Sequence, residues 1–126
     1  MKDSVVLNVS AEKLFKIMKN SVAAESGQKK PDLKAGLSWT RKSNGHKTKV
    51  TLTDWQEPVL YGATFESGNV VLKVRYDLEP MDDKVKVTYT HDLGKSDWLT
   101  RRKEKAAVRK ALSLLKDVEK KLSASK

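Results

Sequence analysis

The stretch WLTRRKEKAAVRKALSLLKDVEKKL, residues 98–122, decides the fold that the sequence predicts. Its apolar residues recur at the spacing of one helix face, and they are Trp98, Leu99, Ala106, Val108, Ala111, Leu112, Leu115, Val118 and Leu122. Ser96 or Asp97 can cap the start of this helix. A helix of about 25 residues is roughly 37 Å long. It would overhang a small flat sheet, so we expect a sheet that curls around it.

Upstream of this helix, the period of the apolar residues falls to two, which is typical of half-buried strands. The alternating runs lie around residues 5–9, 37–41, 50–52, 61–65, 70–78 and 85–91. Turn signals separate the last five runs, namely Ser43-Asn44-Gly45, Glu57-Pro58, Ser67-Gly68-Asn69 and Pro80-Met81-Asp82-Asp83. After the first run, Ser10 predicts the cap of a short helix that ends at Gly27. These signals predict an antiparallel meander preceded by a strand and a helix.

The composition indicates one domain spanning residues 1–126, a length that can bury a core of its own. The sequence contains no cysteine, which excludes disulfides and thiolate metal sites. Its apolar runs are far shorter than the roughly 20 residues of a membrane-spanning helix. No signal-peptide core follows Met1. We therefore expect a soluble, cytoplasmic protein.

The order of these parts resembles the START-like superfamily, also called SRPBCC or helix-grip. Leu7–Phe15 resembles its first strand and capped first helix. Residues 76–90 (YDLEP, then DDKVKVTYT) resemble a hairpin of a small bacterial family known only as a domain of unknown function. The resemblance implies an α+β fold in which a curved antiparallel sheet of about six strands grips a long C-terminal helix, with a short helix after the first strand.

The resemblance also implies a hydrophobic cavity between the sheet and the C-terminal helix, where relatives bind lipids, sterols or polyketides. It carries over no catalytic residue, because the superfamily shares no catalytic motif. The segment between the first helix and the second strand, which commonly helps to form the mouth, is brief here. That brevity is compatible with a small or filled cavity as well as with an open one.

Strand parity selects the side chains that would line such a cavity. The candidates for ligand contact are Trp39, Arg41, Tyr61, Val74, Tyr76, Tyr89 and His91 on the strands and Leu99 on the helix. Tyr and Trp combine apolar contact with a hydrogen bond, which suits an amphipathic ligand. The same pattern also fits an ordinary core, and Arg41 and His91 also fit strand ends that reach solvent. Trp55 breaks the parity of Val50 and Leu52, which predicts that it points outward.

The start of the C-terminal helix predicts a second surface. The formal net charge is +10, and residues 95–126 carry eleven Lys or Arg against four Asp or Glu. The residues predicted to contact an acidic partner, anionic lipid or nucleic acid are Trp98, Arg101, Arg102, Lys103 and Lys105. A solvated helix face that carries no partner would have the same composition.

Three functions follow from the sequence as alternatives. The first is non-enzymatic binding of a small apolar or amphipathic ligand in the groove between sheet and C-terminal helix. The second is an interaction module that uses the basic half of that helix. The third is a hydrolase or cyclase of the same superfamily. The third is disfavoured, because His46 and His91 are far apart and no glycine-rich phosphate loop is present. We expect no cofactor and no metal, and a monomer or homodimer.

Overall fold

The structure is a computed structural model, and it describes residues 1–43, 45–94 and 98–124. The predicted turn residue Asn44, the candidate caps Ser96 and Asp97, and residues 125–126 lie outside the described residues. The elements, in chain order, are β1 (Lys2–Leu7), α1 (Ala11–Ser26), a 3-10 turn (Lys30–Asp32), β2 (Ser38–Ser43), β3 (His46–Gln56), β4 (Leu60–Ser67), β5 (Val70–Met81), β6 (Lys84–Asp92) and α2 (Trp98–Ala124).

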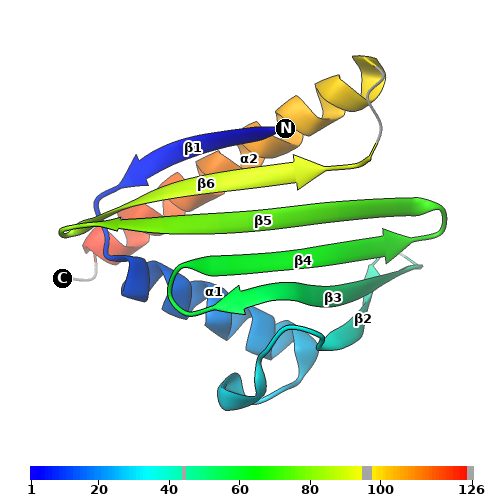
Figure 1. The fold of residues 1–126 in the computed structure, drawn as a ribbon, viewed down its shortest axis with the longest axis horizontal. Coiled ribbons are helices and arrows are strands. Elements are labelled where there is room, and N and C mark those ends of the chain that lie inside the picture. The colour runs from blue at the N-terminus through cyan, green and yellow to red at the C-terminus, as the bar shows by residue number, and fades with distance from the viewer. Residues whose placement is uncertain (44, 95–97, 125–126) are drawn as a thin grey trace.

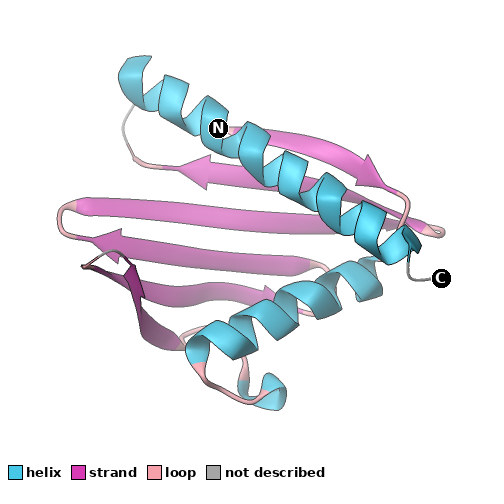
Figure 2. Ribbon diagram, turned by 180° about the vertical axis from the view of Figure 1, so that it is seen from behind, coloured by secondary structure: helices cyan, strands magenta, loops and turns pink. Residues whose placement is uncertain are grey.

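The six strands form one sheet in the order β1-β6-β5-β4-β3-β2, and every neighbouring pair is antiparallel. β2 to β6 form a meander, and β1 is added beside β6 (Figure 1). Both helices cover the same face of the sheet; they lie close together at one end and diverge toward the other (Figure 2). The predicted fold class is confirmed: a curved antiparallel sheet holds a long C-terminal helix, with a short helix after the first strand.

The two ends of α1 are fixed by the residues that the sequence predicted. The Ser10 hydroxyl accepts a hydrogen bond from the Lys13 N–H at 3.2 Å, and Ser10 itself has extended backbone. At the other end Gly27 has a φ of +75°, and its N–H donates to the Ala23 carbonyl at 3.0 Å. These caps satisfy backbone groups that a helix end leaves without intrahelical partners. The helix thereby presents Leu14 and Phe15 to the sheet.

The core lies between the sheet and the two helices, where the innermost side chains are almost inaccessible to solvent. One group of buried residues packs β1, α1 and β6 against α2, and its members include Leu7, Leu14, Phe15, Val85, Val87 and Leu115. A second group lies beneath β2–β5 and the middle of α2, and its members include Val50, Leu52, Ala63, Val74 and Val108. The alternation of buried and exposed residues along each strand is thus accounted for by one packed face and one solvated face.

The inward stripe of α2 differs from the prediction in its first turns. In the predicted apolar stripe, Leu99 and Ala106 are exposed, and so is Trp98, which is also a residue of the predicted interaction surface. The buried positions are Thr100 and Glu104, spaced by four residues and followed by Val108. The sequence pattern was misleading here because the stripe begins with polar residues, which an apolar periodicity does not detect. Leu99, which the sequence predicted to contact a ligand between sheet and helix, is 55% exposed and does not face the sheet.

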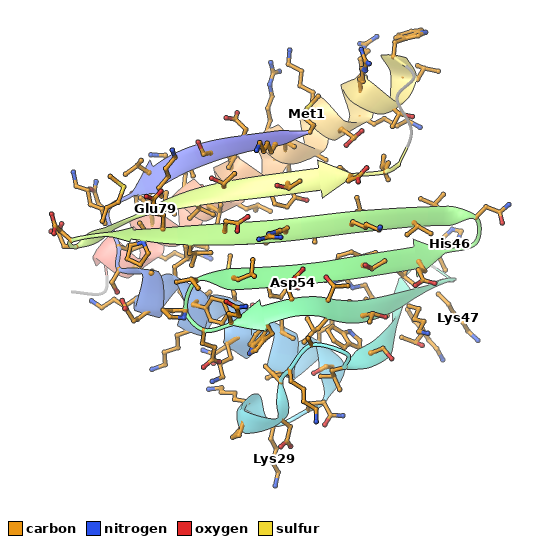
Figure 3. The ribbon with its side chains drawn as sticks, viewed as in Figure 1. Met1, Lys29, His46, Lys47, Asp54 and Glu79 are labelled. Carbon is orange, nitrogen blue, oxygen red and sulfur yellow. The ribbon has the colours of Figure 1, made fainter. Side chains whose placement is uncertain are left out.

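The prediction for Trp55 was also wrong. A β-bulge between Leu52 and Asp54 shifts the register of β3 against β4, so Trp55 returns to the inner face and packs against Phe15. Asp54 is left on the outer face, opposite the helices (Figure 3). Its partner is Gly62, where an added Cβ would lie 2.5 Å from the Asp54 carboxylate. The bulge, unlike regular alternation, places two successive outward residues before the ring.

Candidate functional site

The inner face of the sheet contains a cavity of about 530 Å³. It lies toward the end of the sheet that carries the β2–β3 and β4–β5 turns, where the helices diverge and where His46 and Lys47 are found (Figure 3). Its lining comes from five strands and the residues after β6, and consists of Arg41, Thr48, Tyr61, Phe65, Ser67, Val70, Leu72, Val74, Tyr76, Tyr89 and Leu93. Alternation on each strand turns these side chains to one face, so the lining is mostly aromatic and aliphatic.

A row of four aromatic rings crosses the inner face, and three of the four rings line this cavity. Trp55, Tyr61, Tyr76 and Tyr89 come from four successive strands and are paired across them in register. Their ring centroids are 5.8, 5.6 and 4.7 Å apart, and the first two pairs have edge-to-face geometry. Such pairs stabilise a sheet beyond the burial of their area. The row is therefore a rigid wall on which a ligand could rest.

Tyr61 and Tyr76 also line a second cavity of about 240 Å³, which lies between α1 and α2. The two phenols thus separate the cavity on the sheet from the space between the helices. Burial raises the pKa of Tyr61 to about 12, and burial raises the pKa of Tyr76 as well. Both phenols are therefore protonated near neutral pH and can donate hydrogen bonds to a ligand.

Glu25, near the end of α1, holds two residues of β2 in place. Its carboxylate accepts hydrogen bonds from the Trp39 indole N–H at 2.9 Å and from Arg41 Nε at 2.7 Å. The Arg41 guanidinium also lies over the Phe65 ring, 5.1 Å from its centroid. The hydrogen bond to Glu25 and the contact with the ring together orient the Arg41 side chain. Arg41 is thereby a charged, oriented group at the wall of the cavity.

A set of polar residues, connected by hydrogen bonds and an ion pair, extends from the cavity wall to α2. The Tyr89 hydroxyl lies 2.9 Å from His91 Nδ1, and His91 is only 7% exposed. The amino group of Met1 donates to the His91 carbonyl at 2.8 Å and lies 3.5 Å from the carboxylate of buried Glu104. Burial lowers the pKa of His91 and outweighs the opposing charge of Glu104. His91 is therefore neutral at pH 7 and forms a hydrogen bond with a protonated phenol.

The lowered pKa of His91 predicts how stability depends on pH. Because the folded state disfavours the imidazolium, the stabilising contribution is complete above the ordinary His pKa of 6.5 and is lost as pH falls below it. We expect the free energy of unfolding, measured with urea between pH 7.5 and 5.5, to decrease toward the acid side. His91→Gln should reduce this slope, since the amide does not titrate. An unchanged slope in the variant would contradict the prediction.

The structure brings most of the predicted ligand-contact residues together. Those that line the cavity are Arg41, Tyr61, Val74, Tyr76 and Tyr89. Trp39, His91 and Leu99 are not part of this lining. Trp39 is hydrogen-bonded to Glu25 and His91 to Tyr89, and Leu99 is exposed. Sequence analysis missed Thr48, Phe65, Ser67, Val70, Leu72 and Leu93, which also line it. Strand alternation places Phe65 with Tyr61 and Leu72 with Val74, so the sequence does contain a signal for these two residues.

The second predicted surface, at the start of α2, is exposed as expected. Trp98 is 65% exposed, and the side chains of Arg101, Arg102, Lys103 and Lys105 all face solvent. Within the part of the chain that the structure describes, no helix is long and apolar enough to cross a membrane. Over the same residues, no group of three or more His, Asp or Glu side chains is arranged to hold a metal ion.

Comparison with known proteins places the chain in a family and confirms its fold. Residues 1–112 match the family model described as a domain of unknown function, DUF3284. No curated protein matches the sequence. A START superfamily protein from Mycobacterium smegmatis is 12% identical with a TM-score of 0.65, and the match covers 100% of this chain and 98% of that one.

Two further solved structures share the fold. DynU16, a putative protein in the dynemicin biosynthetic locus, is 11% identical with a TM-score of 0.71; the match covers 100% of this chain but 48% of DynU16, so this chain spans about half of its length. The Aha1 dimer from Colwellia psychrerythraea is 14% identical with a TM-score of 0.63, and the match covers 90% of this chain and 91% of that one. At such identities the likeness establishes the START-like fold alone.

Proposed function

This chain belongs to the DUF3284 family of unknown function, and we propose that it binds a small amphipathic molecule in the cavity on its inner sheet face. The observation that carries the proposal is the size and lining of that cavity. A volume of about 530 Å³ lies in the range of small-molecule sites, which bury most of a ligand's surface. Binding in this proposal requires no chemical step.

The lining has an apolar part and a polar part, and it therefore predicts a ligand with both. Phe65, Leu72 and Val74 offer apolar surface for a hydrophobic body. Arg41 and Thr48, from β2 and β3, offer a guanidinium and a hydroxyl for a polar group near the open end. The ligand that fits this arrangement is amphipathic and contains a hydrogen-bond acceptor. Binding is favoured over a hydrolase or cyclase, because the described lining contains no histidine or carboxylate that could act as a general base.

The cellular location and the assembly of the protein are also part of the proposal. We infer a cytoplasmic location in a bacterial cell, supported by a sequence that needs no oxidising compartment because it has no cysteine. The proposed assembly is a monomer or a homodimer. Native mass spectrometry of protein purified from its own host tests both the bound molecule and the assembly, since each adds a defined mass.

Filling the cavity from β5 should weaken ligand binding. Leu72 lines the cavity, whereas its neighbour Val71 is 44% exposed and points to the opposite face of the same strand. With the apolar fluorophore N-phenyl-1-naphthylamine as the probe, we expect Leu72→Trp to raise the dissociation constant at least about fivefold, because the larger ring occupies part of the cavity. Val71→Trp is the matched control and should bind like the wild type.

Fluorescence titration of the three proteins measures these constants, with urea unfolding to confirm that each variant is folded. Wild-type protein that does not bind the probe would contradict the proposal. Equal affinities for Leu72→Trp and Val71→Trp would also contradict it, since binding would then lie outside this cavity.

A further inference from the structure

Exposed apolar side chains are gathered at the end of the molecule where the cavity opens. Val70, in the lining of the cavity, is 55% exposed, and Trp98 and Leu99 are 65% and 55% exposed. The β4–β5 turn that precedes Val70 and the first turn of α2 lie at the same end of the molecule (Figures 1 and 2). Leu93, in the segment that follows β6, also lines the cavity. This end of the molecule therefore exposes apolar side chains from both β5 and α2.

Exposed cations lie at the same end of the molecule as these apolar groups. Arg101, Arg102, Lys103 and Lys105 are exposed on the first turns of α2, and none of the ion pairs in the described part of the chain involves them. Lys47, beside the β2–β3 turn, is exposed at the same end of the sheet (Figure 3). A cluster of unpaired cations raises the local potential and attracts an anionic surface over about one Debye length.

We propose that this end of the molecule docks on an anionic lipid bilayer, with the cavity mouth facing the membrane. The inference rests on the proposed function, and it names the source of the ligand as an amphipathic lipid of that membrane. The interface of a bilayer accommodates Trp and Leu side chains while its anionic head groups attract Lys and Arg. The phosphates of a nucleic acid would pair with the cations but leave the apolar side chains of Leu99 and Val70 in water. These exposed apolar side chains therefore favour the bilayer. A lipid could then enter the cavity without crossing water.

Sedimentation with lipid vesicles tests the inference. We expect the protein to bind vesicles of phosphatidylcholine with about 30% phosphatidylglycerol, to bind pure phosphatidylcholine at least about tenfold more weakly, and to lose binding in high salt. Arg101→Glu with Arg102→Glu should weaken binding to the anionic vesicles at least about tenfold. Lys120→Glu with Lys121→Glu makes the same charge change at the other end of α2, and it should cause less than about a twofold loss.

A second pair of substitutions tests the apolar part of the contact. Trp98→Ser with Leu99→Ser leaves the charge unchanged but should still weaken vesicle binding at least about fivefold. The serine side chains, unlike Trp and Leu, gain no free energy by entering the bilayer interface. All variants should bind N-phenyl-1-naphthylamine like the wild type. Normal probe binding without vesicle binding would overturn the docking inference and leave the cavity proposal standing.

Two other outcomes would also overturn the inference. One is an equal loss of vesicle binding in the Arg101/Arg102 and Lys120/Lys121 variants, because the attraction would then be a property of the total charge. The other is binding to a DNA duplex or single-stranded RNA that depends on Arg101 and Arg102 while vesicles are not bound, because the partner would then be nucleic acid.

Discussion

Leu115→Asp is expected to destabilise the protein by about 4 kcal/mol, since it buries an unpaired carboxylate in the core. Leu115 is 6% exposed and packs with the core residues of β1, α1 and β6. A loss of this size is comparable with the whole stability of many domains, about 5–15 kcal/mol. The variant should therefore unfold at a much lower urea concentration than the wild type, or be largely unfolded without denaturant.

Leu114 provides the matched control for this prediction. It is the adjacent residue of the same helix, and it is 55% exposed. Leu114→Asp should therefore cost less than about 1 kcal/mol, as is usual for exposed positions. Urea unfolding followed by circular dichroism measures both variants. Equal, small shifts in the two variants would mean that α2 is not held by the sheet, and the fold described above would be wrong.

Tyr76→Ala is expected to have two effects, on stability and on ligand size. Tyr76 contacts Tyr61 and Tyr89 in the aromatic row, with centroid distances of 5.6 and 4.7 Å. Truncation removes both contacts and leaves a hole beside the existing cavity, so we expect a loss of about 3 kcal/mol. Tyr76 also separates the cavities of about 530 and 240 Å³. Its removal should therefore join them into one longer site.

Two probes of different length measure the second effect. The affinity for the rod-shaped fluorophore 1,6-diphenylhexatriene, relative to N-phenyl-1-naphthylamine, should rise at least about fivefold in Tyr76→Ala, because the longer probe needs the joined space. Tyr76→Phe keeps the ring and should leave this ratio unchanged. A ratio that does not change in either variant would show that the phenol at this position does not limit the site.

The fold was predictable because its signals are local and agree with one another. Ser10 and Gly27 mark the ends of α1 by backbone chemistry that any helix requires, and the structure confirms both. Alternation along residues 70–78 and 85–91 gave β5 and β6 their inner faces. The length of α2 then required a curved sheet. The inferences from the helix caps and from strand alternation needed only the chain within a few residues of the feature that they explained.

The parts of the site that escaped prediction depend on long-range contacts. Glu104 is buried although it is charged, because β6 and the amino group of Met1 lie against this turn of α2. No local pattern distinguishes it from the exposed Lys103 and Lys105 on either side. Likewise, the anchoring of Arg41 by Glu25 joins two elements that are separated by a loop. Such partners are set by tertiary packing, which apolar periodicity does not describe.

The bulge in β3 makes the count of residues along that strand a guide to related sequences. In a regular strand one residue separates two inward side chains, whereas Thr53 and Asp54 together separate Leu52 from Trp55. A homologous chain that keeps this two-residue spacing keeps an aromatic ring at the head of the row. A homologue one residue shorter there would have the regular spacing, so its ring would face the core without a bulge. Sequence alignment can therefore identify the family members whose third strand needs the bulge to keep this ring on the inner face.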